Sequence, residues 1–237
     1  MNILDLKVRG YRSLKQVDWT PGALNVVIGP NGSGKSNLLR CLELISIAAK
    51  GNLGKHVQSV GGMEPLLWDN ALDSISFSLR CSPIESNRVP SRDSLTYELE
   101  LRRLGKSGAY SIDKELLANY YKVNIGESSQ PFKFIERDRT RAIIFDENQR
   151  TLVAPEGSLQ QDETVLSSAV GPFSANHVIS EFRSQLASWC VYHDVHVNRD
   201  AAIRQPAVAR SETRLDPDGQ NLISVLHTLS PRTGLSR

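Results

Sequence analysis

The sequence contains little cysteine, no long apolar run and almost no net charge. Its three cysteines, Cys41, Cys81 and Cys190, are widely spaced, which favours reduced thiols in a cytoplasmic protein over a disulfide framework. The apolar runs are far shorter than the roughly 18 residues that a membrane-spanning helix needs. The first residues alternate between apolar and polar, unlike a signal peptide. We therefore expect neither a membrane span nor a secretory leader.

The charge balance excludes a disordered chain but does not select a ligand. Lys and Arg number 28 against 26 Asp and Glu, a net charge of +2, and 40% of the residues are hydrophobic. Ordinary apolar content with little net charge predicts a folded chain. A length of 237 residues suits one large domain or two small ones. A near-neutral charge neither requires nor excludes nucleic acid.

The N-terminal pattern is typical of an α/β fold. Alternation over Leu4–Val8 predicts a half-buried strand, and Val17–Trp19 predicts a second short one. The run Ala23–Ile28 is almost continuously apolar, which predicts a strand buried on both faces. A glycine-rich turn follows. Apolar residues at helical spacing then predict a helix over Lys35–Lys50, ended by Gly51.

From Asp73 to about Val153 the apolar period changes to two, which predicts an antiparallel meander with one solvated face. The predicted strands lie at 75–81, 95–101, 110–112, 132–135, 142–145 and 151–153, with a loop at 82–94. The rest of the chain is predicted as a helical stretch over 162–189 broken at Gly171-Pro172, a strand over 190–197, a polar connection over 199–217 and a final helix over 221–229.

One motif carries a specific chemistry. Residues 29–36 match G-x-x-x-x-G-K-[ST] in full, after an apolar run and before an amphipathic helix. The motif residues are Gly29, Pro30, Asn31, Gly32, Ser33, Gly34, Lys35 and Ser36. Its glycines let consecutive N–H groups line one concavity at the start of a helix, which is an anion site. In this motif Lys35 neutralises the β- and γ-phosphates, and the Ser36 hydroxyl is a ligand for Mg²⁺.

The motif and three further stretches resemble a known family. Asn31–Leu39 looks like the phosphate loop of the ABC, SMC and RecF-like ATPases, and Gly10–Leu14 is similar to the segment that opens their heads. The stretches Gly61–Trp68 and Leu215–Leu226 resemble a narrower group, the bacterial predicted ATPases labelled AAA family, which have an ABC-type head. This resemblance spans nearly all of the chain in order.

The resemblance implies a fold and a ligand. The fold is α/β, a P-loop NTPase core with a mixed sheet plus an antiparallel β subdomain, as in the N-terminal lobe of an ABC-type head. In a single lobe over 1–237, residues 1–60 would form the P-loop unit, 61–160 the β subdomain, and 161–237 a helical segment that starts the C-terminal half. The ligands would be ATP and Mg²⁺, bound by residues 29–36 together with Asn37 and Arg12, with Lys35 as the catalytic lysine and Ser36 as the metal ligand.

The same resemblance implies partners and a process. Such heads close as head-to-tail dimers, so we expect a second copy or a complementing C-terminal ATPase half, with DNA as a possible further partner. ATP hydrolysis would serve DNA maintenance or anti-phage defence. The family's signature loop, its switch histidine and a nameable Q-loop glutamine are missing from the sequence. We therefore expect the chain alone to bind nucleotide and to hydrolyse it poorly. The alternatives are a non-hydrolysing regulatory module and, less well supported because of the long meander, a P-loop kinase.

Four features have two interpretations each. Ala142–Glu147 reads as a Walker B strand ending in Asp146 and Glu147, but a hairpin turn is favoured. Cys190, His193 and His196 have metal-ligand chemistry, but residues three apart on a strand diverge. Three arginine-rich groups, 102–106, 137–141 and 204–214, suit a nucleic-acid backbone or, preferably, a solvated face. Tyr11 and Arg12 contact either the nucleotide or only the protein.

Overall fold

The computed structural model describes residues 1–69, 72–84, 94–105, 108–120, 131–154, 160–168, 176–192, 198–205 and 210–230. These residues form two compact units, Met1–Trp189 and Cys190–Arg237. The first unit contains the sheet, the phosphate-loop motif, four α-helices and a 3-10 turn. The second contains the short 3-10 helix Ala202–Arg204 and helix α5, Leu222–Leu229, at the place predicted for the final helix.

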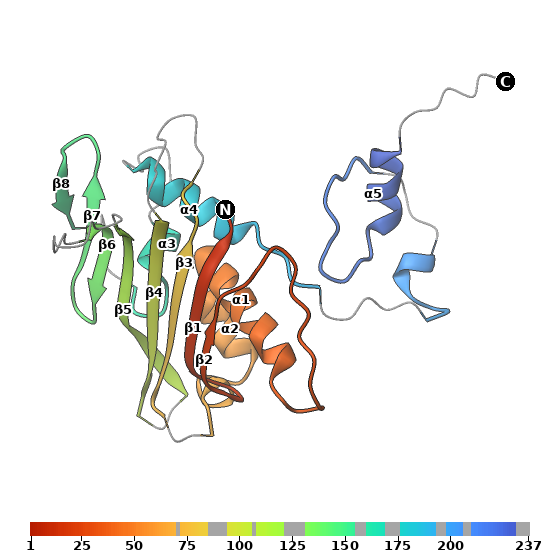
Figure 1. The fold of residues 1–237 in the computed structure, drawn as a ribbon, viewed down its shortest axis with the longest axis horizontal. Coiled ribbons are helices and arrows are strands. Elements are labelled where there is room, and N and C mark those ends of the chain that lie inside the picture. The colour runs from red at the N-terminus through yellow and green to blue at the C-terminus, as the bar shows by residue number, and fades with distance from the viewer. Residues whose placement is uncertain are drawn as a thin grey trace. The chain divides into compact units, whose positions relative to one another are not determined.

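The first unit is built on one eight-stranded sheet in the order β2-β1-β3-β4-β5-β6-β7-β8 (Figure 1). The strands are β1 Ile3–Tyr11, β2 Leu14–Trp19, β3 Ser74–Cys81, β4 Ser94–Leu104, β5 Ala109–Tyr120, β6 Phe132–Asp138, β7 Ala142–Asp146 and β8 Thr151–Val153. Every pairing among these strands is antiparallel, which confirms the predicted meander. Since β1 pairs with both β2 and β3, the N-terminal hairpin and the meander share one sheet.

Helices cover one face of this sheet (Figure 1). They are α1 Lys35–Ala49, α2 Leu53–Ser59, the 3-10 turn Glu64–Leu66, α3 Val165–Ser168 and α4 His177–Ala187. The alternation that predicted the strands turns their apolar side chains towards these helices, so that Phe77, Tyr97 and Leu99 are buried with Leu44 and Phe182. Serine, lysine, arginine and glutamate side chains occupy the opposite face, which confirms the solvated side of the meander.

The strand predicted at Ala23–Ile28 is not formed, which corrects the sequence interpretation. Residues 25–30 have no regular secondary structure, and Leu24, Val26 and Ile28 are 86%, 79% and 87% exposed. A strand buried on both faces needs neighbours on its two edges, and the described strands all pair elsewhere. Because this segment forms no strand, the described residues contain no parallel strand pair. The mixed sheet that the family resemblance implied would have one.

Strand β5 is longer than the predicted segment at 110–112 because a bulge interrupts its alternation. The register shifts between Glu100 and Leu101, so that Leu101 pairs with Ile112 and Glu100 with Lys114. Asp113 is the extra residue. Beyond the bulge, Glu115 lies opposite Leu99 on the buried face. A period-two pattern read from the sequence cannot detect this change of face.

Other predictions were confirmed in part. Helix α1 ends at Ala49 and Gly51 has φ +72°, as a helix stop requires. The break predicted at Gly171-Pro172 lies outside the described residues, as do His193–Val197 and most of the loop at 82–94. Cys190–Tyr192 are described and do not form the strand predicted there. Helix α2 was not predicted, since seven residues show too little periodicity.

Candidate nucleotide-binding site

The phosphate loop leads directly into α1. Gly34 precedes the helix with φ +95°, and Leu38 N–H donates to Gly34 O at 3.0 Å, which starts the helical ladder. No side chain caps the first turn, and that turn contains no acidic residue. The first N–H groups of α1 are therefore open to an anion, and the helix dipole favours negative charge there.

Glycine is required at the last position of the loop. A Cβ on Gly34 would lie 2.9 Å from both the Leu14 Cδ2 and Ser13 Oγ atoms, and its φ lies in the left-handed region. Gly32 also has a positive φ, +82°, but nothing lies within 4 Å of a Cβ placed there. The space beside Gly34 is thus closed by the β1–β2 turn, whereas the space beside Gly32 is open. These residues fit a loop that brings its backbone against a phosphate chain.

Lys35 is bound within the loop. Its Nζ donates to Gly29 O at 2.8 Å and to Pro30 O at 2.7 Å. These two carbonyls hold the ammonium group against the first residues of the loop. A phosphate oxygen entering the loop would meet a positioned cation there.

The β1–β2 turn is attached to the loop helix. Asn37 Nδ2 donates to Ser13 Oγ at 2.8 Å, and the buried Leu14 packs beside Gly34. The stretch after α2 holds the same turn from the other side, because Arg12 N–H donates to Leu66 O and Trp68 N–H donates to Gly10 O. Three of the four stretches that carry the family resemblance thus meet at this turn: Gly10–Leu14, Asn31–Leu39 and Gly61–Trp68.

Arg12 occupies a strained position within this turn. Its φ is +49°, its guanidinium lies 5.8 Å from the Tyr11 ring centroid, and its Nε is buried without a hydrogen-bond partner. Tyr11 itself is buried against Phe77, so it does not face a ligand. Burial lowers the pKa of His56, Glu43 opposes that shift, and Arg12 adds to it. Tyr11 is therefore a core residue, as one of its two interpretations predicted. Arg12 has an Nε–H group that donates to no partner.

The opposite end of α1 is anchored by a network that the sequence did not reveal. Glu115 is fully buried and accepts hydrogen bonds from Tyr97 Oη and from the N–H groups of Val165 and Leu166. Next to it, Thr164 Oγ1 donates to Ala48 O at 3.0 Å. Burial raises the pKa of Glu115, and the two backbone donors oppose that shift. Thr164 and the first two residues of α3 therefore fasten the end of α1 to β4 and β5.

The buried Arg137 completes this network. Its guanidinium donates to Gln160 O and Glu163 O, both at 2.8 Å. The carboxylate of Glu163 accepts from the N–H groups of Leu53 and Gly54 at the start of α2. Arg137 was one of the arginines considered for a nucleic-acid surface, and it is only 2% exposed.

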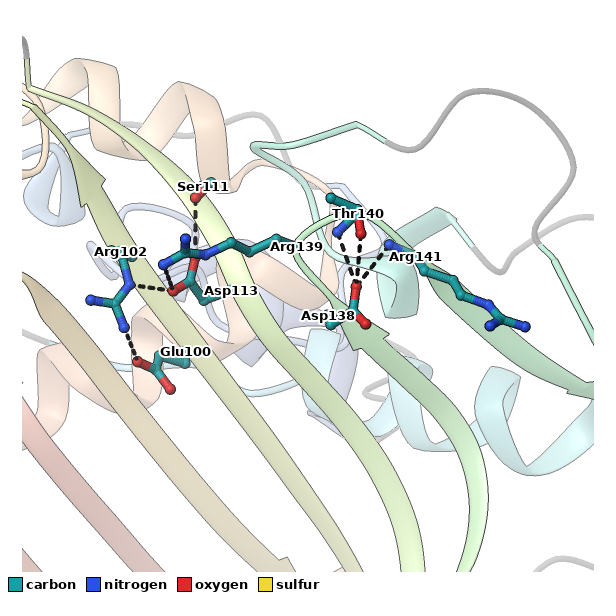
Figure 2. A network of polar contacts seen from close by, with 8 residues as sticks. All are labelled: Glu100, Arg102, Ser111, Asp113, Asp138, Arg139, Thr140 and Arg141. Atoms are coloured by element: carbon teal, nitrogen blue, oxygen red, sulfur yellow. Dashed lines mark hydrogen bonds and ion pairs between the residues drawn. The ribbon is translucent and has the colours of Figure 1, made fainter.

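Three other arginines considered for a nucleic-acid surface, Arg102, Arg139 and Arg141, lie in ion pairs or turns on the solvated face (Figure 2). Asp113 accepts two hydrogen bonds from Arg139, at 2.8 Å each, and another from Arg102. Partial burial raises the pKa of Asp113, but the hydrogen bonds and charges of Arg139 and Arg102 outweigh it and the pKa is lowered. Asp138 accepts from the N–H groups of Thr140 and Arg141 and so closes the β6–β7 turn. The interpretation as a solvated face fits these contacts.

The hairpin interpretation of Ala142–Glu147 is confirmed. Strands β7 and β8 pair antiparallel, and Asp146 Oδ1 accepts from the N–H groups of Asn148 and Gln149 in the turn between them. Glu147 Oε1 accepts from His177 N–H. Both carboxylates are used by the fold and belong to the meander.

No group of three or more His, Cys, Asp or Glu side chains is placed to hold a metal ion in the part of the chain that the structure describes. Among the described helices, none combines the length and apolarity needed to cross a bilayer.

Comparisons with known proteins agree with the loop geometry. Residues 24–215 match the family model described as "AAA domain, putative AbiEii toxin, Type IV TA system". The phosphonates import ATP-binding protein PhnC of Bdellovibrio bacteriovorus is 25% identical over 159 residues, 66% of this chain and 59% of that protein. The OLD nuclease of Thermus scotoductus is 40% identical over 40 residues, 17% of this chain and 8% of that protein. The chain thus spans at most about three fifths of the curated relatives it matches.

A solved structure described with ATP-driven dimerisation and DNA-stimulated activation of SMC ATPases also aligns. The TM-score is 0.37 at 15% identity, covering 49% of this chain and 69% of that chain.

Proposed function

We propose, from the premise that this chain belongs to the AAA domain family whose model covers most of its length, that it binds ATP with Mg²⁺ as part of an ABC-type ATPase head. The observation that carries the proposal is the loop at residues 29–36, which leads into an uncapped helix start and in which Lys35 Nζ is held by the Gly29 and Pro30 carbonyls. Residues 29–36, with Asn37 and Arg12, would form the nucleotide site. Ser36 would bind the metal ion.

The chemistry follows from charge and position. Phosphoryl transfer needs the γ-phosphate to be held and its developing charge to be neutralised. Lys35 would leave the Gly29 and Pro30 carbonyls for the phosphates, and the helix start would hold the phosphate oxygens. Arg12, whose Nε is buried without a hydrogen-bond partner, lies in the β1–β2 turn that Asn37 ties to the loop helix, which supports a role at the site. Bound Mg²⁺ would neutralise the phosphates.

The proposal includes a complementing ATPase half, either in the same polypeptide or in a second chain. Leu24, Val26 and Ile28 leave an apolar segment open immediately before the loop. Apolar segments of this kind are buried in folded proteins unless they mark an interaction site. Strands from the second half would pair with this segment and fix the loop from behind. A head-to-tail pair of such heads would then supply the residues that cap the γ-phosphate.

Hydrolysis by this chain alone should be slow. The Asp146–Glu147 pair, which resembled the end of a Walker B strand, serves a turn of the meander and is not available to activate water at the loop. This favours the second candidate, a nucleotide-binding module that has no turnover of its own. The process we propose is DNA maintenance or anti-phage defence. It is supported by the family description and by the short similarity to a nuclease.

Nucleotide titration tests the proposal. A fluorescent ATP analogue with Mg²⁺ should bind the chain, and Lys35→Ala should weaken its affinity about 10- to 100-fold, because a charge-assisted contact contributes roughly 1.5–3 kcal/mol. Lys50→Ala, at the far end of α1, is the matched control and should bind as the wild type does. Equal binding by Lys35→Ala and the wild type would refute the site.

Turnover separates the two candidates. Steady-state hydrolysis should stay near the uncatalysed rate for this chain and should appear when a C-terminal ATPase half is added. Rapid turnover by the chain alone, lost in Lys35→Ala, would contradict the need for a second half. Persistent inactivity after mixing would favour the binding module.

A further inference from the structure

The face of the sheet opposite α1 and α4 contains a charge pattern with a definite order. A depression of about 310 Å³ lies over strands β2, β1, β3, β4 and β5. Its lining includes three basic side chains, Lys7, Arg9 and Lys114, and three acidic ones, Asp18, Glu98 and Glu100. The charges cancel in sum, and they are separated by strand: the bases of β1 lie on one side and the acids of β4 on the other.

The ladder places these residues in two straight rows. Lys7 pairs with Ser78, which pairs with Glu98. Arg9 pairs with Ser76, which pairs with Glu100. Each row therefore reads base, serine, acid across β1, β3 and β4. Since neighbouring strands are about 4.8 Å apart, the base and the acid of one row flank a strip of small side chains on β3.

This order favours one kind of partner. A polyanion such as DNA would meet Lys7 and Arg9 favourably but would also meet Glu98 and Glu100. A partner that fits must carry the same separation of charge in the opposite order. A second copy of this chain does so when the two solvated faces meet across a twofold axis that runs along β3.

We propose that two copies of this chain associate face to face through this surface, without nucleotide. Rotation by 180° about an axis along β3 exchanges the positions of β1 and β4. Lys7 of one copy then faces Glu98 of the other, and Arg9 faces Glu100, twice in each dimer. The same rotation sets β2, with Asp18, against β5, with Lys114. A twofold axis at right angles to the strands would instead set β1 against β1 and oppose like charges.

The dimensions suit this arrangement. Packed sheets lie about 10 Å apart, and a lysine or arginine together with a glutamate spans such a gap. Lys7 and Arg9 are exposed. The acids have partners within their own chain, since Lys114 lies 2.6 Å from Glu98 and Arg102 lies 3.3 Å from Glu100. The arriving bases would join these pairs and form charge networks, which should weaken as salt is added. This interface lies on the opposite side of the sheet from α1 and is separate from the ATP-dependent pair proposed above.

Charge reversal tests the proposal by sedimentation without nucleotide. The wild type should dimerise, and Lys7→Glu with Arg9→Glu should weaken association at least tenfold, as should Glu98→Lys with Glu100→Lys. Mixing the two variants should restore dimers at wild-type strength, because both sets of facing charges become complementary again. The quadruple variant that carries all four changes should dimerise with itself.

Controls keep the outcome decisive. Lys50→Glu with Lys55→Glu changes the net charge equally, lies away from this face and should not alter association. Lys35→Ala should leave this dimer intact. A failure of the dimer proposal can therefore be distinguished from a failure of the nucleotide-site proposal. Should a reversed variant misfold, Lys7→Gln with Arg9→Gln gives the milder test and should also weaken association. A monomeric wild type, or variants that do not recover on mixing, would overturn the proposal.

Discussion

The two ends of helix α1 lie in opposite environments. At its C-terminal end, Thr164 bonds Ala48 O and the buried Glu115 fastens the adjoining segment to the sheet. At its N-terminal end, the loop is exposed, the first turn is uncapped, and Leu24 and Ile28 are solvated apolar residues. The far end therefore contributes stability, whereas the loop end is left open to a ligand and a partner.

The difference shows how a fold separates stability from binding. A buried carboxylate is tolerated in a fold only where its three hydrogen-bond donors are held in fixed positions. A phosphate site needs N–H groups that remain unpaired until the ligand arrives. Placing both on one helix lets the anchored end hold the open end in position. Four substitutions, from the largest expected effect to the smallest, probe the two ends of α1 and, at Asp113, the solvated face of the sheet.

Glu115→Ala should cost the most. It leaves Tyr97 Oη and two N–H groups without their acceptor and removes the negative charge near the buried Arg137. The free energy of unfolding in urea should fall by about 3–5 kcal/mol. Glu136→Ala, which breaks an exposed pair with Lys133, is the control and should cost less than about 1 kcal/mol. Equal losses in the two variants would mean that the far end is not the anchor.

Gly34→Ala should come next and should be worse than Gly32→Ala. Both need a positive φ, which costs a residue with a Cβ roughly 1–2 kcal/mol. Only Gly34 also meets Leu14 and Ser13, so we expect a loss of about 2–3 kcal/mol there against about 1 kcal/mol at Gly32. Thermal unfolding gives the stability and ATP titration the affinity. If the two variants behave alike, the β1–β2 turn does not close the loop.

Asp113→Asn should have an effect of about 1 kcal/mol or less that depends on pH. The pKa of Asp113 is lower in the folded chain than in the unfolded chain, because Arg139 and Arg102 outweigh partial burial. Its carboxylate therefore stabilises the fold above pH about 4, and this contribution is lost as the pH falls through the folded value. Wild type and variant should differ at pH 7 and converge in acid. Arg102→Gln with Arg139→Gln should abolish the difference.

Val26→Ser should change the stability of the chain least, within about 0.5 kcal/mol, since the side chain is 79% exposed. Val8→Ser, at a buried position of β1, is the matched control and should lose about 2–4 kcal/mol. The consequence of Val26→Ser should appear only when a complementing half is added, as weaker association. A loss above about 1 kcal/mol in the chain alone would show that the segment is already packed.

Much of this arrangement could be predicted from the sequence. The spacing of residues 29–36 identified the loop, the apolar positions of Lys35–Ala49 predicted α1, and alternation predicted the central strands. These signals are local, because a motif or a period repeats within a few residues. The Asp146–Glu147 turn was also favoured correctly, since the residues after it suit a hairpin better than a catalytic strand end.

The predictions that failed depended on distant parts of the chain. Ala23–Ile28 has the composition of a buried strand, but burial needs neighbours that the described sheet does not provide. Glu115 reads as a solvent-facing residue until the bulge at Asp113 reverses the face of β5. Arg137 donates hydrogen bonds to the backbone of the 160–163 segment, and no pattern in the sequence predicts this contact either.

The sequence by itself determined the phosphate loop, the helix behind it and the two-sided meander, because backbone conformation and amphipathic period are set by neighbouring residues. Only the tertiary structure decided which end of α1 is anchored, which carboxylates are buried, and that the segment before the loop remains unpaired. Those outcomes depend on which strands and helices meet, and hydrogen bonding between segments far apart in the chain is not encoded in any local pattern.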